Sequence, residues 1–379
     1  MTISPGTKPR LPSHYYVLYE PPDSVGDEAL IFVSERRRIA IKGTLFREFL
    51  RSVVPMLDGR NTVAEIQAAA ADLFPANEVT SALELLARHH LLAEDEGVAP
   101  LAPQLNFFHE LNESSSAMQE RLAKATVTIV GLGGAGSLVA AHFAATGIRS
   151  LWLLDSSRVV ETDSYFDPVF QNSDCGSPRA VVVAHALESR FPHLHITTND
   201  QAAQSEEALV TAIAGSDLVV CCLDRGEASS LYKLNRACMA ARIPWISCAV
   251  SGFEIVIGPA VRPSETPCYL CYTMRSVACT DRPEDAFGFQ RFLDHRNRDD
   301  GSRRENLVFT AGLAANLLGL EAMKLLTGFA PSAITGAILV LDVMDMTMKK
   351  HTILQHPRCP VCFTAKTADE KMEATAAVG

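Results

Sequence analysis

The sequence predicts a two-part α/β protein, in which a Rossmann-like domain with a mostly parallel sheet follows a small winged-helix α+β domain. Three observations predict this fold class. Strand and helix patterns alternate along residues 127–342, a glycine-rich stretch follows the first apolar strand of that series, and two Cys-x-x-Cys pairs lie far apart in the chain. Such alternation specifies a parallel sheet covered by helices. We expect the domains to span residues 1–100 and 101–379.

The composition is that of an ordinary globular protein. The 379 residues are 47% hydrophobic and 21% charged, which is enough apolar chain to bury a core in two or three domains. The formal net charge of −10 excludes a general nucleic-acid binder, which needs a basic surface. No apolar run approaches the length of a membrane-spanning helix, and residues 1–10 lack a signal-peptide core. We therefore expect a cytoplasmic protein with no membrane or nucleic-acid partner.

The first domain is expected to place three strands before three helices. The strands are predicted at residues 15–19, 29–33 and 38–41. A first helix follows from Leu45 to Val54, Thr62-Val63-Ala64-Glu65 is a capping box that opens a second, and a third covers residues 78–90. This order of elements is typical of a winged helix. A DNA-binding role is disfavoured because the last helix offers a single arginine.

The second domain is expected after a linker at residues 97–105, which contains Pro100-Leu101-Ala102-Pro103. Its strands are predicted at residues 127–130, 150–154, 218–222, 245–250 and 337–342. Its helices are predicted at residues 137–146, 178–190, 228–241 and 310–327. The charged stretch at residues 277–305 interrupts this series, and we interpret it as a crossover loop.

A glycine-rich stretch joins the first strand of this domain to its first helix. The strand at 127–130 runs directly into Gly131-Leu132-Gly133-Gly134-Ala135-Gly136. Glycines permit a tight turn there, and the N-terminus of the following helix attracts phosphate. We therefore predict that the loop binds a nucleotide, through Gly131, Gly133, Gly134 and Gly136. A structural turn without a ligand is the alternative, and a nicotinamide enzyme is disfavoured because no hydride-transfer His or Tyr stands out.

Three charged side chains are candidates for the same site. Asp155 ends the second strand, where a carboxylate can accept hydrogen bonds from ribose hydroxyls. Asp224 follows the strand at 218–222 and could hold Mg²⁺ beside a nucleotide, because the carboxyl ends of parallel strands face the ligand crevice. Arg179 could reach phosphate. The alternatives are a helix N-cap for Asp224 and a solvated helix residue for Arg179.

Four of the ten cysteines form two pairs, Cys268-Tyr269-Leu270-Cys271 and Cys359-Pro360-Val361-Cys362. In a long chain without an export signal, such pairs indicate a metal site more often than disulfides. Four thiolates suit tetrahedral zinc and leave no open position for catalysis. We therefore predict a structural zinc ion that joins the C-terminal tail to the sheet domain. Most of the other six cysteines are interpreted as small buried hydrophobic residues.

These motifs, in this order, resemble the ubiquitin-activating superfamily, specifically its bacterial ThiF, MoeB and HesA branch. The resemblance covers residues 105–365 and implies a domain that binds Mg-ATP and transfers AMP to a carboxylate. It implies phosphate contact at the glycine loop, ribose contact at Asp155, Mg²⁺ near Asp224 and a catalytic role for Arg179. The residues that carry it are the glycine loop with Ser137, Asp155, Asp174-Cys175-Gly176-Ser177-Pro178-Arg179-Ala180, Leu223-Asp224, Asn235 as a further cofactor-binding residue, and both cysteine pairs.

The chain departs from that family in its cations. The usual Asn-Leu-x-Arg-Gln stretch reads Ser164-Tyr165-Phe166-Asp167-Pro168, so its arginine is missing. An Arg-Gln pair usual before the first strand is absent from residues 107–110, and Arg179 replaces a phosphate-contacting lysine. Arginine contacts phosphate well, but the loss of two other cations weakens the expectation of efficient adenylation. Cys279, followed by Thr280 in the crossover loop, is the candidate thioester nucleophile.

The first domain resembles the PqqD-like recognition element of ribosomal-peptide (RiPP) maturation enzymes. The resemblance is carried by Leu57-Asp58-Gly59-Arg60-Asn61-Thr62-Val63-Ala64-Glu65-Ile66. It implies that an extended leader peptide pairs with the third strand, at 38–41, and lies against the helix at 78–90. This is strand addition at a sheet edge.

Two hypotheses join the halves. In the first, the protein resembles the maturases of microcin C and pantocin type: it binds a precursor leader peptide and activates a peptide carboxylate with Mg-ATP. In the second, the missing arginines mark a catalytically degenerate fold that presents the leader to a YcaO-type cyclodehydratase. Sulfur-carrier activation ranks third because it leaves the first domain unexplained. The apolar helix at 310–327 and the family resemblance further predict a homodimer.

Overall fold

The computed structural model describes residues 2–22, 28–93, 101–111, 114–201, 205–223, 228–285, 288 and 307–363. The chain forms two compact units, Met1–Glu120 and Arg121–Gly379. These units meet after Glu120, and the predicted domain bounds of 1–100 and 101–379 stay a prediction. Helix α4 (Ala102–His109) belongs to the first unit because Asn106 Nδ2 donates to Ser13 Oγ at 3.1 Å. This helix starts inside the expected linker at 97–105. Its Leu105 and Phe108 side chains are buried, so this part of the chain is packed rather than a free connection.

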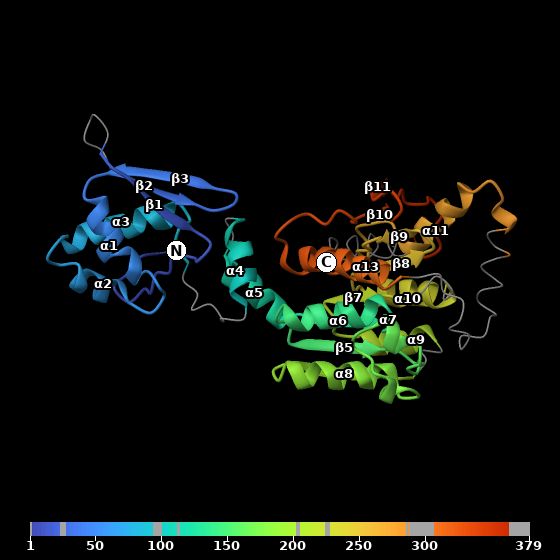
Figure 1. Cartoon of the computed structure of the whole chain (residues 1–379). Helices are drawn as coiled ribbons and strands as arrows, with labels where there is room; N and C mark the ends of the chain where they lie inside the picture. The colour runs from blue at the N-terminus through green and yellow to red at the C-terminus, as the bar shows by residue number, and fades with distance from the viewer. Residues whose placement is uncertain are drawn as a thin grey trace, which may run out of the picture. The chain divides into compact units, whose positions relative to one another are not determined.

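The N-terminal unit is built on a small antiparallel sheet. Strands β1 (Tyr16–Glu20), β2 (Glu28–Val33) and β3 (Arg38–Gly43) form the sheet in that order, so β2 lies in the centre (Figure 1). All three predicted strands are confirmed. Among the described residues, β3 pairs with β2 alone, which leaves its other side as a sheet edge.

Three helices complete the core of this unit. They are α1 (Phe46–Ser52), α2 (Val63–Ala69) and α3 (Ala76–Arg88), with a short 3-10 turn at Val54–Met56. The predicted capping box is present: Thr62 N–H donates to Glu65 Oε2 at 2.7 Å, and Glu65 N–H donates to Thr62 Oγ1 at 3.3 Å. The helices bury one face of the sheet in a core that includes Phe32, Phe49 and Leu83.

The C-terminal unit contains an eight-stranded sheet within the described residues, in the order β11-β10-β9-β8-β7-β4-β5-β6. The run from β8 to β6 is parallel, as predicted, and β9, β10 and β11 extend it with antiparallel pairs. The strands are β4 (Thr126–Val130), β5 (Ser150–Leu154), β6 (His195–Asn199), β7 (Leu218–Cys221), β8 (Trp245–Ser251), β9 (Glu254–Ile257), β10 (Ala337–Asp342) and β11 (Thr347–Thr352).

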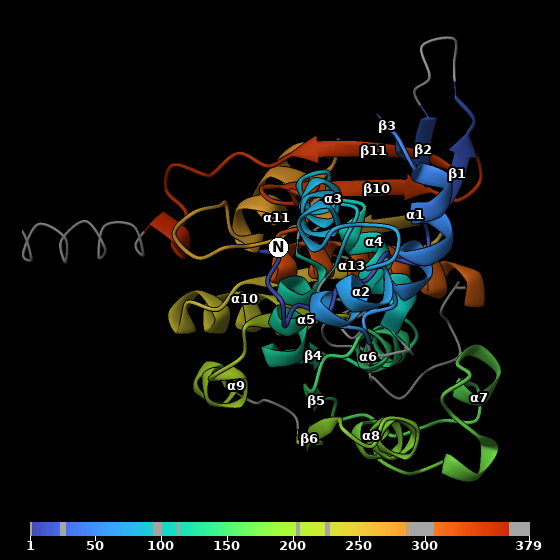
Figure 2. The same ribbon diagram turned by 90° about the vertical axis from the view of Figure 1, so that its left-hand side faces the viewer.

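Helices cover both faces of the parallel part of this sheet. Figure 2 shows α6 (Ala135–Ala145) and α8 (Arg179–Arg190) on one side, and α9 (Glu206–Ile213) and α10 (Ala228–Ala241) on the other. Helix α13 (Val308–Thr327) packs against α6, β8 and β9. Shorter elements are helix α5 (Ser115–Lys124), helix α7 (Asp163–Phe166), a 3-10 turn at Asn172–Asp174 and helix α11 (Tyr269–Ala278).

The strand order reverses beside β4, and this reversal positions the site. Val130, the last residue of β4, is paired with Leu154 of β5 on one side and with Cys221 of β7 on the other. The crossovers from β4 and β7 therefore leave the sheet in opposite directions. In open α/β sheets the crevice beyond the carboxyl ends of such strands binds ligands. The glycine loop starts at this point.

Helix α13 corrects one expectation. Its 20 residues are long and apolar enough to cross a bilayer by length and composition, although no such run was expected. Within the protein, 44% of its apolar window is buried, and its contacts with α6, β8 and β9 make it a core helix. The cytoplasmic location stays a prediction.

Candidate nucleotide and metal sites

The glycine loop is a tight turn in which two glycines are required by geometry. Gly131 has φ +85°, and a β-carbon there would lie 3.1 Å from the Cys222 backbone. A β-carbon on Gly136 would lie 1.9 Å from the Gly131 carbonyl oxygen, so no other side chain fits without moving the loop. Gly133 O accepts from Gly136 N at 3.1 Å, and Gly134 directly precedes helix α6. The loop therefore places backbone N–H groups at a helix N-terminus, which is an arrangement that binds anions.

Asp155 holds this loop in place. Its Oδ2 accepts a hydrogen bond from Leu132 N–H at 2.6 Å, and its Oδ1 accepts one from Ser157 N–H at 2.7 Å. Both carboxylate oxygens thus bind backbone groups, one from the glycine loop and one from the turn after β5. The predicted ribose contact stays a proposal, and a carboxylate oxygen has a second lone pair with which to make it.

Arg179 is not the solvated helix residue of the alternative interpretation. It is 9% exposed at the first position of α8, and its guanidinium makes a two-pronged contact with Asp163. Arg179 Nε lies 3.1 Å from Asp163 Oδ2, and Arg179 Nη2 lies 2.8 Å and 2.7 Å from the two carboxylate oxygens. Such fork-on-fork pairs are the strong form of the charge-assisted hydrogen bond.

Asp167 is a second buried carboxylate of this region. It follows helix α7, is 3% exposed and accepts a hydrogen bond from the hydroxyl of Ser137, in the first turn of α6. Burial raises the pKa of the Asp167 carboxyl, and the Ser137 hydrogen bond opposes that rise. Sequence reasoning noted only that Asp167 stands in a stretch that departs from the family. One sequence feature could have indicated these buried acids: Asp163 and Asp167 stand four residues apart, shortly before Arg179.

The remaining predicted nucleotide residues are placed differently. Asp224 lies outside the described residues, so its proposed Mg²⁺ role rests on its position one residue after Leu223. Asn235 is 1% exposed on α10, and its Oδ1 accepts a hydrogen bond from Tyr269 N–H at 3.0 Å. Asn235 therefore joins α10 to the start of α11, beside Cys268. Its Nδ2 has no hydrogen-bond partner among the described residues.

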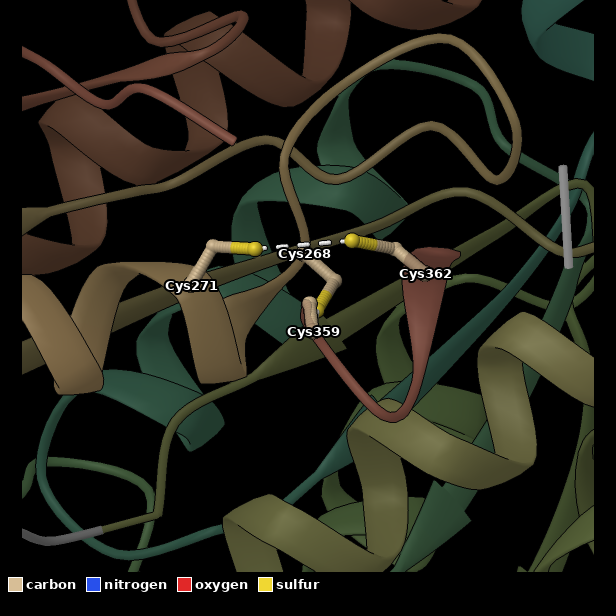
Figure 3. Close-up of side chains that lie close together, drawn as sticks. All are labelled: Cys268, Cys271, Cys359 and Cys362. Carbon is tan, nitrogen blue, oxygen red and sulfur yellow. Dashed lines mark hydrogen bonds between the residues drawn. The ribbon is translucent and has the colours of Figure 1, made fainter. Parts of the chain in front are cut away.

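The two cysteine pairs meet, as the sequence predicts. Figure 3 shows one pair at the start of α11 and the other in the C-terminal segment, with their thiols turned toward a common centre. Cys268 Sγ lies 3.6 Å from Cys359 Sγ, Cys271 Sγ lies 3.4 Å from Cys362 Sγ, and all four sulfur atoms lie within 4.8 Å of one another. Four sulfurs about 2.3 Å from one tetrahedral ion would be roughly 3.8 Å apart, so the cluster has the size of a metal site.

The surroundings of the cluster also suit thiolates. Contact with Cys268 lowers the pKa of Cys362 to about 4, whereas burial raises the pKa of Cys271 to about 12. A cation bound between the four sulfur atoms would favour their thiolate form. Two donors face the sulfurs: His356 N–H lies 3.3 Å from Cys271 Sγ, and Gln355 Nε2 lies 3.3 Å from Cys362 Sγ. Such outer hydrogen bonds orient and stabilise metal-bound ligands.

The other cysteines divide into two groups. Four are buried, as expected for small hydrophobic residues: Cys221, Cys222, Cys238 and Cys248. Cys175 and Cys279 are exposed. Cys279 follows the last residue of α11 and caps that helix through its backbone N–H. Most of the predicted crossover loop at 277–305 lies outside the described residues, so the nucleophile role of Cys279 stays untested.

The strand order, the glycine loop and the cysteine cluster define a Rossmann-like protein whose crevice is suited to a nucleotide. Residues 101–361 match the ThiF family, so the chain belongs to this family. The molybdopterin-synthase adenylyltransferase of Salmonella typhimurium is 27% identical over 248 residues, covering 64% of this chain and 89% of the relative. Protein HesA of Nostoc sp. is 28% identical over 248 residues, covering 65% and 88%. The ThiF-type fold predicted from the motifs is thus confirmed.

Solved structures extend the likeness to both units. E. coli MccB in complex with MccA-N7isoASN matches with a TM-score of 0.66 at 15% identity, covering 94% of this chain and 99% of the other. PaaA matches with a TM-score of 0.65 at 17% identity, covering 90% and 99%. At these identities the likeness shows a shared fold. The PqqD-like assignment of the N-terminal unit stays a prediction.

Proposed function

We propose that this protein acts in ribosomal-peptide maturation: it binds the leader of a precursor peptide and activates a carboxylate of that peptide with Mg-ATP. One observation carries the proposal. Among the described residues, β3 forms the edge of the sheet in one unit, and a glycine loop lies at a strand-order reversal in the other. Relatives of the second unit are adenylyltransferases, which makes transfer of AMP the reaction of choice.

The nucleotide half of the proposal is supported by the crevice beyond β4. The loop N–H groups and the start of α6 would face the phosphates, Asp155 would contact the ribose, and Asp224 would hold Mg²⁺. ATP would supply the AMP group, and the attacking carboxylate would come from the peptide. Arg179 would contact phosphate once it leaves Asp163. Asn235 would contribute from α10, where its Nδ2 has no hydrogen-bond partner among the described residues.

The peptide half is supported by strand β3. Ile39 and Ile41 lie on the face of β3 that packs toward the helices of the N-terminal unit. An extended peptide on the outer side of β3 would continue the sheet through main-chain hydrogen bonds, with alternate side chains against α3. MccB, which shares the fold of the whole chain, has been solved with N-formylated MccA.

Zinc in the cysteine cluster would be structural. Four thiolates would close its coordination sphere, so the ion would hold the C-terminal segment against α11 without taking part in chemistry. A homodimer is part of the same proposal. Helix α13 leaves Leu320 47% exposed, and a second copy of the chain would cover this side chain.

The proposal is tested by incubating the full-length protein with ATP, Mg²⁺ and synthetic precursor peptides from neighbouring genes. Adenylation predicts peptide-dependent release of pyrophosphate and a mass increase on the peptide that depends on its carboxylates. Asp224→Ala should abolish release, whereas Asp200→Ala, an exposed matched control, should not. Absence of turnover with a peptide that binds would contradict the adenylation step.

A second candidate function is favoured by the Asp163–Arg179 pair. Arg179, which is predicted to contact the phosphates, is already paired with the Asp163 carboxylate. A second buried acid, Asp167, is hydrogen-bonded to Ser137 in the first turn of α6. A protein of this kind could bind the leader and present it to a YcaO-type cyclodehydratase without using ATP itself. Modification by the pair of proteins that survives Asp224→Ala would establish this role, and complete loss would count against it.

A further inference from the structure

The guanidinium group of Arg179 is paired with a carboxylate of the same chain, that of Asp163. Asp163 contacts Arg179 through both of its oxygens, and the two side chains are 16% and 11% exposed, respectively. Asp163 Oδ2 also accepts Val160 N–H at 2.9 Å, which fixes the carboxylate in its turn. Arginine uses the same fork of N–H groups for carboxylates and for phosphates. Asp163 therefore takes up the group that a phosphate would need.

Two chains of contacts connect this pair to the glycine loop. On one side, Arg179 N–H donates to Ser157 O at 3.0 Å, and Ser157 N–H donates to Asp155, which holds the loop at Leu132. On the other side, Asp163 starts the short helix that ends before Asp167, and Asp167 binds Ser137 in the first turn of α6. The pair is thus tied to both ends of the loop.

We propose that the Asp163 carboxylate competes with the nucleotide phosphates for Arg179, and that Asp163 thereby sets the affinity of the glycine loop for triphosphates. The proposal rests on the proposed function only in taking a nucleotide as the ligand of the loop. Breaking a buried ion pair leaves a charge without a partner and is costly. A phosphate that replaces Asp163 keeps the arginine paired, so nucleotide binding is an exchange of one anion for another.

The exchange lowers affinity for a calculable reason. A ligand that needs a state populated for only a fraction of the time binds more weakly by that same fraction. If Arg179 is free of Asp163 for about one tenth of the time, removal of the carboxylate tightens triphosphate binding roughly tenfold. Adenosine has no phosphates, so its affinity is unaffected by this competition.

The experiment measures binding of the non-hydrolysable analogue AMPCPP with Mg²⁺, and of adenosine, to the full-length protein by calorimetry. Asp163→Asn removes the charge and keeps an acceptor for Val160 N–H. Asp163→Ser replaces it if the first variant fails to fold, as judged by thermal melting. Glu161→Gln is the matched control, because Glu161 is an exposed acid two residues away. The double variant Asp163→Asn/Arg179→Ala tests whether any gain passes through the arginine.

We expect the Asp163 variant to bind AMPCPP about ten times more tightly than the natural protein, with unchanged adenosine affinity and no gain in the control or the double variant. Unchanged or weaker AMPCPP binding overturns the proposal, and weaker binding would make Asp163 a positioning residue for Arg179. Equal tightening of adenosine also overturns it. Peptide-dependent turnover plays no part in this readout, so the inference can stand where adenylation fails.

Discussion

A β-carbon on Gly136 would lie 1.9 Å from the carbonyl oxygen of Gly131, five residues earlier in the same loop. The two glycines close the turn between β4 and α6 against each other, which leaves the glycine loop a single shape. Leu132 between them is buried, and its N–H is held by Asp155. The shape of the glycine loop therefore depends on this close backbone approach.

The first prediction concerns this contact. Gly136→Ala should destabilise the C-terminal unit by about 1–3 kcal/mol, the usual range for overpacking, and abolish AMPCPP binding because the loop must move. The control is Gly319→Ala on α13, where a β-carbon would meet nothing within 4 Å. That change should be neutral or mildly stabilising because alanine favours helix. Chemical denaturation and calorimetry measure both effects; equal stability of the two variants would contradict the prediction.

A second prediction concerns the cysteine cluster. The purified protein should contain one zinc ion per chain, and Cys359→Ser should lower the melting temperature by on the order of 10 °C because metal binding contributes to folding. Cys175→Ser, at an exposed thiol, is the matched control and should melt as the natural protein does. Elemental analysis that finds no metal in folded protein would refute the zinc assignment.

The third prediction concerns the edge of β3. Proline at Ile39 or Ala40 removes one backbone N–H, and successive N–H groups along a strand point to opposite sides. One of the two variants should therefore weaken binding of the cognate leader peptide by tenfold or so, equivalent to about 1.4 kcal/mol, and the other should disturb pairing with β2. Fluorescence anisotropy with a labelled leader measures the effect. Two folded variants with natural affinity would exclude strand addition at β3.

The fourth prediction concerns assembly. The protein should be a homodimer, and light scattering should give about twice the chain mass of 41.1 kDa. Leu320→Glu, on the exposed side of α13, should shift the mass toward the monomer because a buried charge is costly at an apolar contact. Leu73→Glu is the control, because Leu73 is similarly exposed at 52% in the N-terminal unit. A monomer at micromolar concentration with ATP and peptide present would contradict dimerisation.

The fifth prediction concerns pH. Burial raises the pKa of the Asp167 carboxyl in the folded state, so the folded protein binds this proton more tightly than the unfolded chain does. The proton's contribution to stability is complete below the unfolded pKa and is lost as pH rises through the folded pKa. Asp167→Asn removes this loss, so the variant should gain stability relative to the natural protein as pH rises above the ordinary pKa of an aspartate. Denaturant midpoints measured as pH rises test the sign, and a constant difference between the two proteins would refute it.

The sequence predicted the strands that form longer apolar runs, but it did not predict β6 or the short buried strand β9. The strand that ends at Val130 and the strand that starts at Leu218 are apolar runs, and both lie in the centre of the parallel sheet. By contrast, β11 was missed because all six of its residues are exposed and no apolar alternation marks them. It is held by pairing with β10, whose own Leu341 is buried. Such a strand depends on tertiary contact more than on local pattern.

The site was predicted where spacing carries chemistry. The two Cys-x-x-Cys pairs indicate a four-thiol cluster whatever lies between them, and the structure brings them together. The partner of Arg179 was not predicted, because Asp163 lies in a short irregular segment 16 residues away. Hydrophobic periodicity predicts helices and strands, but it cannot predict which side chains of separate segments come into contact. From the sequence, Arg179 could be a solvent-exposed residue of a helix. In the structure it is buried, because the fold brings Asp163 into contact with it.

The two cysteine pairs also hold together the two ends of a long stretch of chain. The residues they join are 91 positions apart, and the charged segment at 277–305 lies inside the loop that they close. Because both ends of this loop are fixed at one point, the segment can change in length without shifting α11 or the C-terminal strands. A change in chain length between the two cysteine pairs would therefore leave the cysteine cluster itself in place.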